Sequence, residues 1–248
     1  MYFGLIRKKL DLPDITLICV SGVKSFKSLS SIYRSARKCN FGKIVFVSTV
    51  LPEIKIGNFS IEKPLGTSLK SINEYNWYCI YKLNTHIQTK YALVVQYDSA
   101  VLHAEKWRNE FLDYDYIGAP WPISANAYKD PFGKTQRVGN GGFSLRSKKL
   151  LEVPKTRDIP WDVVGDGFYK TFNTDLLSED GNICVHNRHL YELEGCKFAP
   201  VEVAMHFSYE NDVPENFGIK PFGFHKNNPW STRKRIRTIL SNLKNGKS

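Results

Sequence analysis

The sequence lacks any apolar run long enough to span a membrane, and no signal-peptide core precedes Asp11. Its five cysteines are scattered and include no CxxC pair. This distribution argues against a zinc site and against a disulfide framework. Together these absences favour a reduced, cytoplasmic protein without a membrane-spanning segment.

The signatures of several large α/β enzyme classes are also missing. No GxGxxG follows the first expected strand, there is no phosphate loop of the GxxxxGKS or GxxxxGKT type, and GxSxG is absent. The glycine-rich segment at 139–142 comes too late in the chain to be the first of these motifs. Dinucleotide-dependent dehydrogenases, phosphate-loop kinases and serine hydrolases are therefore disfavoured.

Positive charge is abundant and concentrated at the end of the chain. The formal net charge is +11, and the segment from Lys226 to Ser248 supplies +7 of it with no acidic residue. Four apolar residues of this segment recur at the spacing of one helical stripe: Ile236, Ile239, Leu240 and Leu243. Such a helix suits an anionic membrane surface, where each nearby basic residue contributes about 1 kcal/mol. The alternative is a terminal helix that docks its stripe on the domain.

Strands and helices alternate through the first part of the chain. Apolar runs predict strands over 15–20, 43–48 and 91–97, and helical spacing predicts helices over 25–36, capped by Ser25, and over 72–87. The apolar stripe of the first helix consists of Phe26, Leu29, Tyr33 and Ala36. This order predicts a parallel α/β sheet with right-handed crossovers. Since no linker interrupts it, we expect one domain over 1–230 and a basic tail over 231–248.

Asp98 directly follows the apolar run 91–97. A continuous apolar run indicates a strand that is covered on both faces, and ligands bind outside the carboxyl ends of such strands. A carboxylate at this point, followed by Ser99 and Ala100, can reach a metal ion or a sugar hydroxyl. The alternative is a helix N-cap, because residues 103–112 have helical spacing.

Three later clusters carry polar groups suited to a site. A glycine-rich turn runs into a strand over 138–146, where glycines allow close backbone approach and Asn140 offers both a donor and an acceptor; a plain tight turn is the alternative. Glu179 and Asp180 precede an expected helix over 182–193, either as complements of its dipole or with one of them as a general base. His225 lies among aromatic residues, where a packed core histidine is the alternative to a ligand.

This ordered set resembles the GT-A-fold glycosyltransferases, and more closely a small bacterial group found among cell-surface polysaccharide genes. The resemblance extends over about residues 14–225. It implies an α/β, GT-A-like nucleotide-sugar-binding fold with a mainly parallel central sheet flanked by helices. The end of the first strand would hold the nucleotide through Val20, Ser21 and Gly22. The Asp motif would hold a divalent metal on the diphosphate through Asp98, with His225 completing the metal shell.

The remaining clusters take roles around the two sugars. By the resemblance, the glycine turn lines the sugar pocket through Asn140, Gly141 and Gly142, and the Glu-Asp pair faces the acceptor. An inverting transferase needs a carboxylate base, for which Asp180 is the first choice and Glu179 the second; a retaining one does not. A separate segment contains Tyr116 and Trp121, which could stack on a sugar or pack in the core.

One departure from the family pattern concerns the metal. The usual motif has two acidic residues spaced by one, whereas this chain reads Asp98-Ser99-Ala100. A carboxylate, an imidazole and phosphate oxygens still suit Mn²⁺ or Mg²⁺, bound weakly.

The sequence thus predicts a metal-assisted glycosyltransferase that moves a sugar from a nucleotide-diphosphate sugar, with a UDP-sugar favoured, to a hydroxyl of a surface glycan or lipid-linked glycan. We expect it in the cytoplasm, peripheral on the inner face of the cytoplasmic membrane through the basic tail helix. Two alternatives remain: a catalytically weak or inactive sugar-nucleotide-binding relative, and a nucleic-acid-binding module. The second is disfavoured because the charge is terminal and no nucleic-acid-binding signature occurs.

Overall fold

The computed structural model of the chain describes residues 8–123, 129–161 and 178–226. The predicted tail, residues 231–248, lies outside the described residues. None of the described helices is long and apolar enough to cross a membrane.

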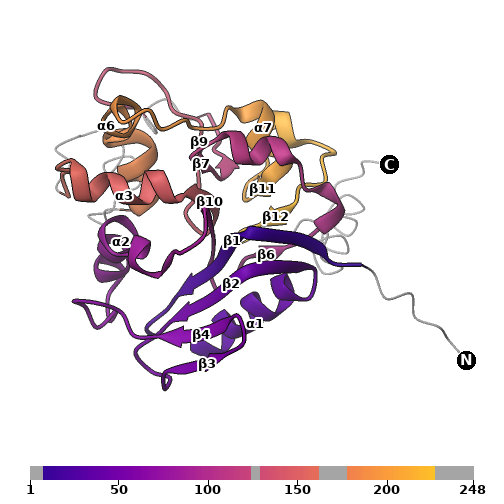
Figure 1. The fold of residues 1–248 in the computed structure, drawn as a ribbon. Coiled ribbons are helices and arrows are strands. Elements are labelled where there is room, and N and C mark those ends of the chain that lie inside the picture. Colours follow the sequence, from indigo (N-terminus) through magenta and orange to yellow (C-terminus); the bar gives the residue numbers. More distant parts are fainter. Residues whose placement is uncertain (1–7, 124–128, 162–177, 227–248) are drawn as a thin grey trace, which may run out of the picture.

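A seven-stranded sheet with the order β3-β4-β2-β1-β5-β10-β7 forms the centre of the molecule (Figure 1). Its strands are β1 (Leu10–Val20), β2 (Cys39–Val47), β3 (Ile54–Ile56), β4 (Phe59–Glu62), β5 (Tyr91–Val95), β7 (Tyr116–Ile117) and β10 (Phe143–Ser147). Strands β4, β2, β1 and β5 are parallel, while β3 and β10 run antiparallel to their neighbours. The predicted α/β fold with a mainly parallel central sheet is confirmed.

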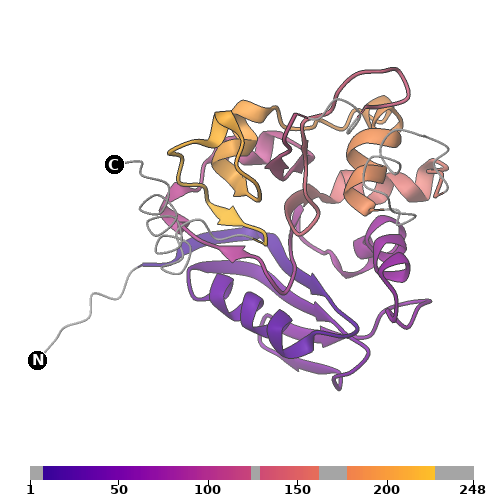
Figure 2. The same ribbon diagram turned by 180° about the vertical axis from the view of Figure 1, so that it is seen from behind.

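Helices cover both faces of this sheet (Figures 1 and 2). The helices are α1 (Ser25–Ala36), α2 (Ile72–Tyr81), α3 (Lys148–Thr156), α5 (Glu179–Gly181), α6 (Arg188–Leu193) and α7 (Val201–Phe207), with a π-helical turn at Asn182–His186. One core cluster joins the sheet to α2, α3 and the π-helical turn, and the other joins it to α1 and α7. Because both faces are covered, the residues of β5 after Tyr91 are all buried.

Two small sheets complete the fold and carry part of the site. The first has the order β11-β12-β6 and consists of β11 (Ser208–Tyr209), β12 (Gly223–Phe224) and β6 (Ala100–Val101). The second pairs β8 (Ala119–Pro120) with β9 (Val138–Gly139). Within the described residues, short 3-10 turns lie at Leu83–His86, Ala104–Lys106, Asn109–Asp113 and Pro214–Asn216.

The first helix turns a different face to the sheet from the one we predicted. Its buried residues are Ile32 and four serines, namely Ser25, Ser28, Ser31 and Ser35. Phe26 and Tyr33 of the predicted apolar stripe are exposed instead. Small hydroxyl side chains let α1 approach the strands closely and bond to the turn beyond β5. The cap also differs, because α1 starts at Ser25 after Lys24 without any side-chain cap.

Three other local predictions were wrong. The helix expected over 72–87 starts with a Ser71–Glu74 capping box but ends at Tyr81, and a 3-10 turn follows. The segment between the predicted strand over 43–48 and the predicted helix over 72–87, for which no element was predicted, contains β3 and β4. Residues 103–112 form 3-10 turns rather than one helix.

Candidate functional site

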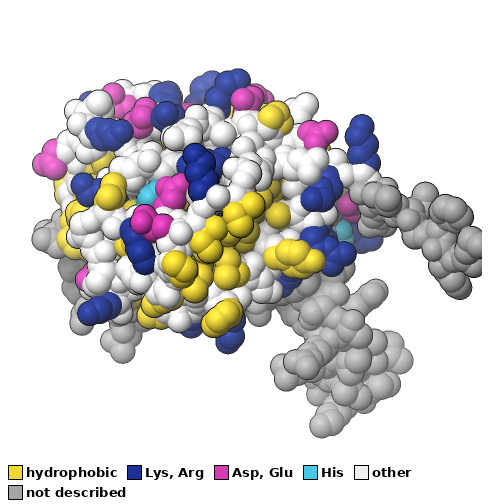
Figure 3. Space-filling model, turned by 60° about the horizontal axis from the view of Figure 1, so that its bottom comes forward, with side chains coloured by type: hydrophobic (Ala, Val, Ile, Leu, Met, Phe, Trp, Pro, Cys, Tyr) yellow, Lys and Arg dark blue, Asp and Glu magenta, His cyan; other side chains and the backbone are white. Residues whose placement is uncertain are grey.

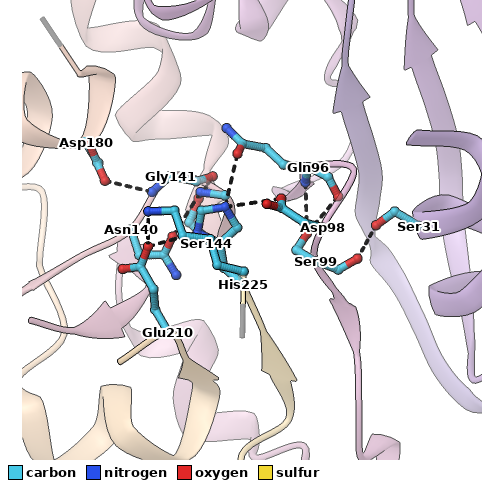
Figure 4. A network of polar contacts seen from close by, with 12 residues as sticks. Ser31, Gln96, Asp98, Ser99, Asn140, Gly141, Ser144, Asp180, Glu210 and His225 are labelled. Carbon is cyan, nitrogen blue, oxygen red and sulfur yellow. Dashed lines mark hydrogen bonds and ion pairs between the residues drawn. The ribbon is translucent and has the colours of Figure 1, made fainter. Parts of the chain in front are cut away.

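Asp98 lies in the turn between β5 and β6, at the carboxyl end of β5 (Figure 4). The backbone amide of Gln96 donates to Ser99 Oγ at 2.9 Å, which closes the turn. The Ser99 carbonyl accepts hydrogen bonds from the Ser31 hydroxyl and, at 3.1 Å, from Arg34 Nη2. Helix α1 therefore ties down the loop beside Asp98. Because β6 starts at Ala100 and no helix begins at Asp98, the N-cap alternative is excluded.

The three-stranded sheet brings His225 to this turn. Phe224 of β12 pairs with Ala100 of β6, so the next residue, His225, arrives beside the turn that holds Asp98. His225 Nε2 lies 3.4 Å from Asp98 Oδ1 and 3.1 Å from Gln96 Oε1. The two residues predicted as metal ligands are thus neighbours, together with a side-chain amide oxygen that the sequence did not indicate.

The other ring nitrogen of His225 faces a buried carboxylate. Tyr209 of β11 pairs with Phe224, which places Glu210 beside His225, and its Oε1 lies 3.1 Å from His225 Nδ1. Lys226 Nζ approaches the same Oε1 at 2.8 Å. A carboxylate on the far nitrogen is the usual way in which proteins orient a metal-ligating histidine.

These contacts shift three pKa values. Burial acts to lower the pKa of His225, but Asp98 and Glu210 oppose this and raise it above the ordinary value. Burial acts to raise the pKa of Asp98 and of Glu210, but the hydrogen bond and charge of His225 outweigh it, so both pKa values are lowered. These contacts therefore favour the ionised form of both carboxylates.

The glycine-rich turn packs directly against these side chains. The backbone amide of Gln96 also donates to the Gly142 carbonyl at 3.0 Å, which joins the glycine-rich turn to β5. A Cβ at Gly142 would collide with the His225 ring, and one at Gly141 would collide with the Glu179 carboxylate. The predicted role of these glycines was close approach of the backbone to a ligand; in the structure they admit the site's own side chains.

Asn140 occupies the left-handed region, with φ of 70°, at the start of this turn. Its Oδ1 accepts from the Gly142 amide at 3.2 Å. The side chain is buried, and its Nδ2 has no hydrogen-bond acceptor within the part of the chain that the structure describes. A buried donor without a partner is costly, so Asn140 Nδ2 is available for a ligand.

Glu179 and Asp180 both contact the glycine turn at Gly141. Glu179 is buried and paired with the fully buried Arg146 at 2.9 Å. Burial raises the pKa of Glu179, the charge of Asp180 adds to the rise, and Arg146 opposes it. Asp180 is more accessible and accepts from the Gly141 amide at 3.1 Å and the Gly181 amide at 2.9 Å. Asp180 is therefore the carboxylate of the pair that can act on a bound molecule.

The residues predicted to hold the nucleotide lie at the carboxyl end of β1. Val20 is buried in the core, so it presents its backbone rather than its side chain. The Ser21 amide donates to the Val47 carbonyl at 2.9 Å, and Gly22 leads toward α1. Beside this segment, Lys24 Nζ lies 3.7 Å from the centre of the Tyr97 ring, next to Asp98.

Trp121 and Tyr116 are packed into the core. Trp121 is only 4% exposed, and its ring fills the space in which a Cβ at Gly139 would lie. Tyr116 is fully buried and stacks on Phe198. Neither ring presents an open face to a sugar, so both residues pack in the core rather than stack on a ligand.

Sequence reasoning missed three residues of this network: Gln96, Glu210 and Arg146. Gln96 belonged to an apolar run, and Arg146 is a buried charge inside a strand, which is rare without a partner. Glu210 follows Ser-Tyr without any motif. The two residues before it form strand β11 in the structure, but a Ser-Tyr dipeptide does not indicate a strand.

The donor set fits a hard divalent cation in part. Asp98 Oδ1, His225 Nε2 and Gln96 Oε1 converge, and carboxylate, imidazole and amide oxygen are ligands that Mn²⁺ and Mg²⁺ accept. Among the described residues, no three His, Cys, Asp or Glu side chains form a ready-made metal group. Phosphate oxygens and water would have to supply the remaining ligands.

Comparison with solved structures identifies similar folds. The chain matches a structure of the galactosyltransferase LgtC in complex with donor and acceptor sugar analogues, with 12% identity, a TM-score of 0.52, and coverage of 92% of this chain and 95% of that chain. A structure of an active-site mutant of LgtC matches with 12% identity, a TM-score of 0.50 and the same coverage. At this identity the likeness shows the fold, which is that of a GT-A glycosyltransferase.

No curated protein matches the sequence. A family model described as a protein of unknown function, DUF5672, matches residues 59–225. The matched segment includes Asp98, the glycine turn, the Glu179–Asp180 pair, Glu210 and His225, and it is the larger part of the chain. The protein therefore belongs to the DUF5672 family.

Proposed function

We propose that this protein is a glycosyltransferase that moves a sugar from a nucleotide-diphosphate sugar to a hydroxyl of a surface glycan. The observation that carries the proposal is the convergence of Asp98, His225 and Gln96 beside Asp180, across the glycine turn. This cluster lies at the carboxyl end of β5 in a fold similar to that of LgtC, whose structure holds donor and acceptor sugar analogues.

Asp98 and His225 would hold Mn²⁺ or Mg²⁺, with Gln96 as a third protein contact. When bound, such a cation neutralises charge that develops on a departing diphosphate. Glu210 keeps the His225 ring aligned through Nδ1, and Lys226 adds a positive charge at the same edge. Asn140 would donate its Nδ2 hydrogen to a sugar hydroxyl in the pocket beside Gly141 and Gly142.

Asp180 is the proposed base. In an inverting reaction the acceptor hydroxyl loses its proton as its oxygen attacks the anomeric carbon, and a carboxylate within hydrogen-bond reach takes that proton. The backbone amides of Gly141 and Gly181 fix the Asp180 carboxylate in place. Glu179, by contrast, is occupied by Arg146 and serves to support the turn.

The nucleotide would bind at Val20, Ser21 and Gly22, and we favour a UDP-sugar as donor. The acceptor would be a glycan or lipid-linked glycan at the inner face of the cytoplasmic membrane. The basic tail, by its sequence alone, would attach the protein to the anionic surface there.

Ligand-induced stabilisation tests this proposal. The melting temperature of the full chain is measured with UDP, GDP or CDP and their sugars, with and without Mn²⁺, and compared with Asp98→Ala. Saturation at about 100 times Kd stabilises a protein by about 2.7 kcal/mol. We expect one nucleotide to raise the melting temperature in a Mn²⁺-dependent manner, and Asp98→Ala to remove that dependence and the transfer of labelled sugar while the unliganded melting temperature stays unchanged.

The other outcomes identify the alternatives. Nucleotide binding without transfer to any acceptor would identify an inactive sugar-nucleotide-binding relative. Stabilisation by single-stranded nucleic acid but by no nucleotide sugar would contradict the proposal. Transfer that survives Asp98→Ala within a few-fold would remove Asp98 from the metal site.

A further inference from the structure

The outward face of α1 is apolar and cationic, although a helix on a sheet normally turns its apolar stripe inward. Phe26 is 84% exposed and Tyr33 is 63% exposed, while the serines of the helix are buried. The helix contains Lys27 and Arg34 and no acidic residue. Large aromatic side chains and positive charges are thus exposed to solvent on the same helix.

Strand β3 extends this apolar surface. Ile54 pairs with Ile61 and Ile56 with Phe59 across the antiparallel ladder, and paired residues share one face of a sheet. Ile61 and Phe59 belong to the core cluster that contains α1, so Ile54 and Ile56 lie on the side of α1. Ile56 is 70% exposed. We call the surface of Phe26, Tyr33, Ile54 and Ile56 the α1–β3 face, and Figure 3 shows hydrophobic side chains gathered in one band across this side of the molecule.

A basic groove adjoins the α1–β3 face at Tyr33, which lines both. It has a volume of about 1210 Å³, and its cationic lining consists of Lys8, Lys9, Arg34, Arg37 and Lys38. Two carboxylates also line it, but Asp11 accepts a hydrogen bond from Asn40 and Glu105 lies 3.4 Å from His103 Nδ1.

The described residues supply little carboxylate charge to balance the groove's cations. Within the described part of the chain, Lys8, Lys9, Arg34 and Arg37 form no ion pair with a carboxylate. Arg34 instead contacts the Ser99 carbonyl, and Arg37 lies over the Tyr33 ring. The segment that follows Lys226 is itself basic, so its charge cannot balance the groove.

We propose that the α1–β3 face and the basic groove dock together on an anionic lipid bilayer. Aromatic and aliphatic side chains would enter the interface while the groove's cations meet phosphate-bearing headgroups. A second copy of the chain is a poorer occupant, because it would bring two uncompensated cationic grooves together. Nucleic acid is also a poorer occupant, because half of the face consists of the isoleucines Ile54 and Ile56, which offer no stacking surface for bases. This surface belongs to the folded domain, and its proposed role depends neither on the tail nor on glycosyl transfer.

Binding of the full chain to vesicles tests the proposal. Co-sedimentation is measured with phosphatidylcholine vesicles that contain or lack phosphatidylglycerol, for the wild type and for Phe26→Ser/Ile56→Ser. The matched control is Phe217→Ser/Leu193→Ser, which removes two apolar residues that are 92% and 69% exposed on other elements. We expect the first variant to bind anionic vesicles at least about tenfold more weakly and the control to bind like the wild type.

Two further measurements separate this face from the other sources of binding. The groove variant Lys9→Glu/Arg37→Glu should weaken binding to anionic vesicles, and the loss should shrink at high salt. A polarity-sensitive fluorophore on Ser30→Cys, at the exposed side of α1, should shift to the blue on vesicles, whereas one on Lys149→Cys should not. The five native cysteines are buried and leave these positions selectively reactive.

Several results would overturn the proposal. These are equal vesicle binding by the wild type and Phe26→Ser/Ile56→Ser, no binding of the wild type to anionic vesicles, or an unshifted probe at position 30. A dimer in light scattering that Phe26→Ser/Ile56→Ser dissociates would assign the face to a second copy. Binding of single-stranded DNA that the groove variant abolishes, without vesicle binding, would assign it to nucleic acid.

Discussion

Glu179 and Asp180 are adjacent in sequence but differ in their surroundings. Glu179 neutralises Arg146 in the core, and Asp180 lies beside the glycine turn with its oxygens on backbone amides. The same chemical change at the two positions should therefore affect different properties: stability for the first and turnover for the second.

We expect Asp180→Asn to lower kcat by about 10²–10⁴-fold, the usual contribution of a positioned base, with little change in the donor KM or the unfolding free energy. We expect Glu179→Gln to lower the free energy of unfolding by up to about 3–5 kcal/mol, because it leaves the Arg146 charge buried without an anion. Steady-state kinetics and urea unfolding measure the two effects. A stable Glu179→Gln protein without turnover, next to an active Asp180→Asn protein, would reverse the assignment.

At the scale of elements, the buried serines of α1 have unequal environments. The Ser31 hydroxyl donates to the Ser99 carbonyl beside Asp98, whereas the Ser25 hydroxyl is buried without a hydrogen-bond partner in the described residues. Ser31→Ala should lower the unfolding free energy by about 1 kcal/mol and weaken Mn²⁺ binding, since the Asp98 turn loses an anchor. Ser25→Ala, the matched control, should change stability by less than about 0.5 kcal/mol. Equal effects of the two variants would show that α1 does not hold the turn.

A second element-scale prediction concerns the link between β4 and the 3-10 turn at Leu83–His86. Burial acts to raise the pKa of Glu62, but hydrogen bonds from His86, Ser60 and Lys43 outweigh it and lower the pKa from 4.5 to about 2. Because the pKa of Glu62 is lower in the folded protein than in the unfolded chain, its carboxylate stabilises the fold at pH values above the unfolded pKa. This stabilisation disappears as the pH falls from 4.5 toward 2.

The wild type should therefore exceed Glu62→Gln in unfolding free energy by a constant amount at neutral pH, and the gap should close between about pH 5 and pH 2. Urea unfolding at a series of pH values measures it. A gap that is independent of pH would mean that the carboxylate charge is not what stabilises this contact.

At the scale of the whole molecule, the strands that consist of continuous apolar runs could be predicted from the sequence. The strand before Asp98 and the strand ending at Val20 both occur. Strand β3 was not predicted, because Ile54 and Ile56 are 37% and 70% exposed and flank a lysine, so the sequence has no pattern of buried residues there. The orientation of α1 was predicted wrongly, because close packing of its serines against the sheet outweighed the hydrophobicity of Phe26 and Tyr33.

The candidate site was predictable only where its residues stand out along the chain. Asp98 and His225 differ sharply from their apolar neighbours, and both lie in the site. Gln96 and Glu210 join it through strand pairing, and neither the order β11-β12-β6 nor its register can be read from dipeptide strands. The roles of all these residues in catalysis and metal binding remain predictions for the experiments above.

The β11-β12-β6 sheet has a consequence for the order of folding. It joins Gln96 to His225 across 129 residues, and closing so long a loop costs entropy before any contact repays it. The main sheet can form from the segments that precede this closure, so we expect the cation site to assemble in the last kinetic step. In a refolding experiment, Mn²⁺ affinity should return after the far-UV circular dichroism. On the ribosome, the candidate site could form only after His225 has emerged from the exit tunnel.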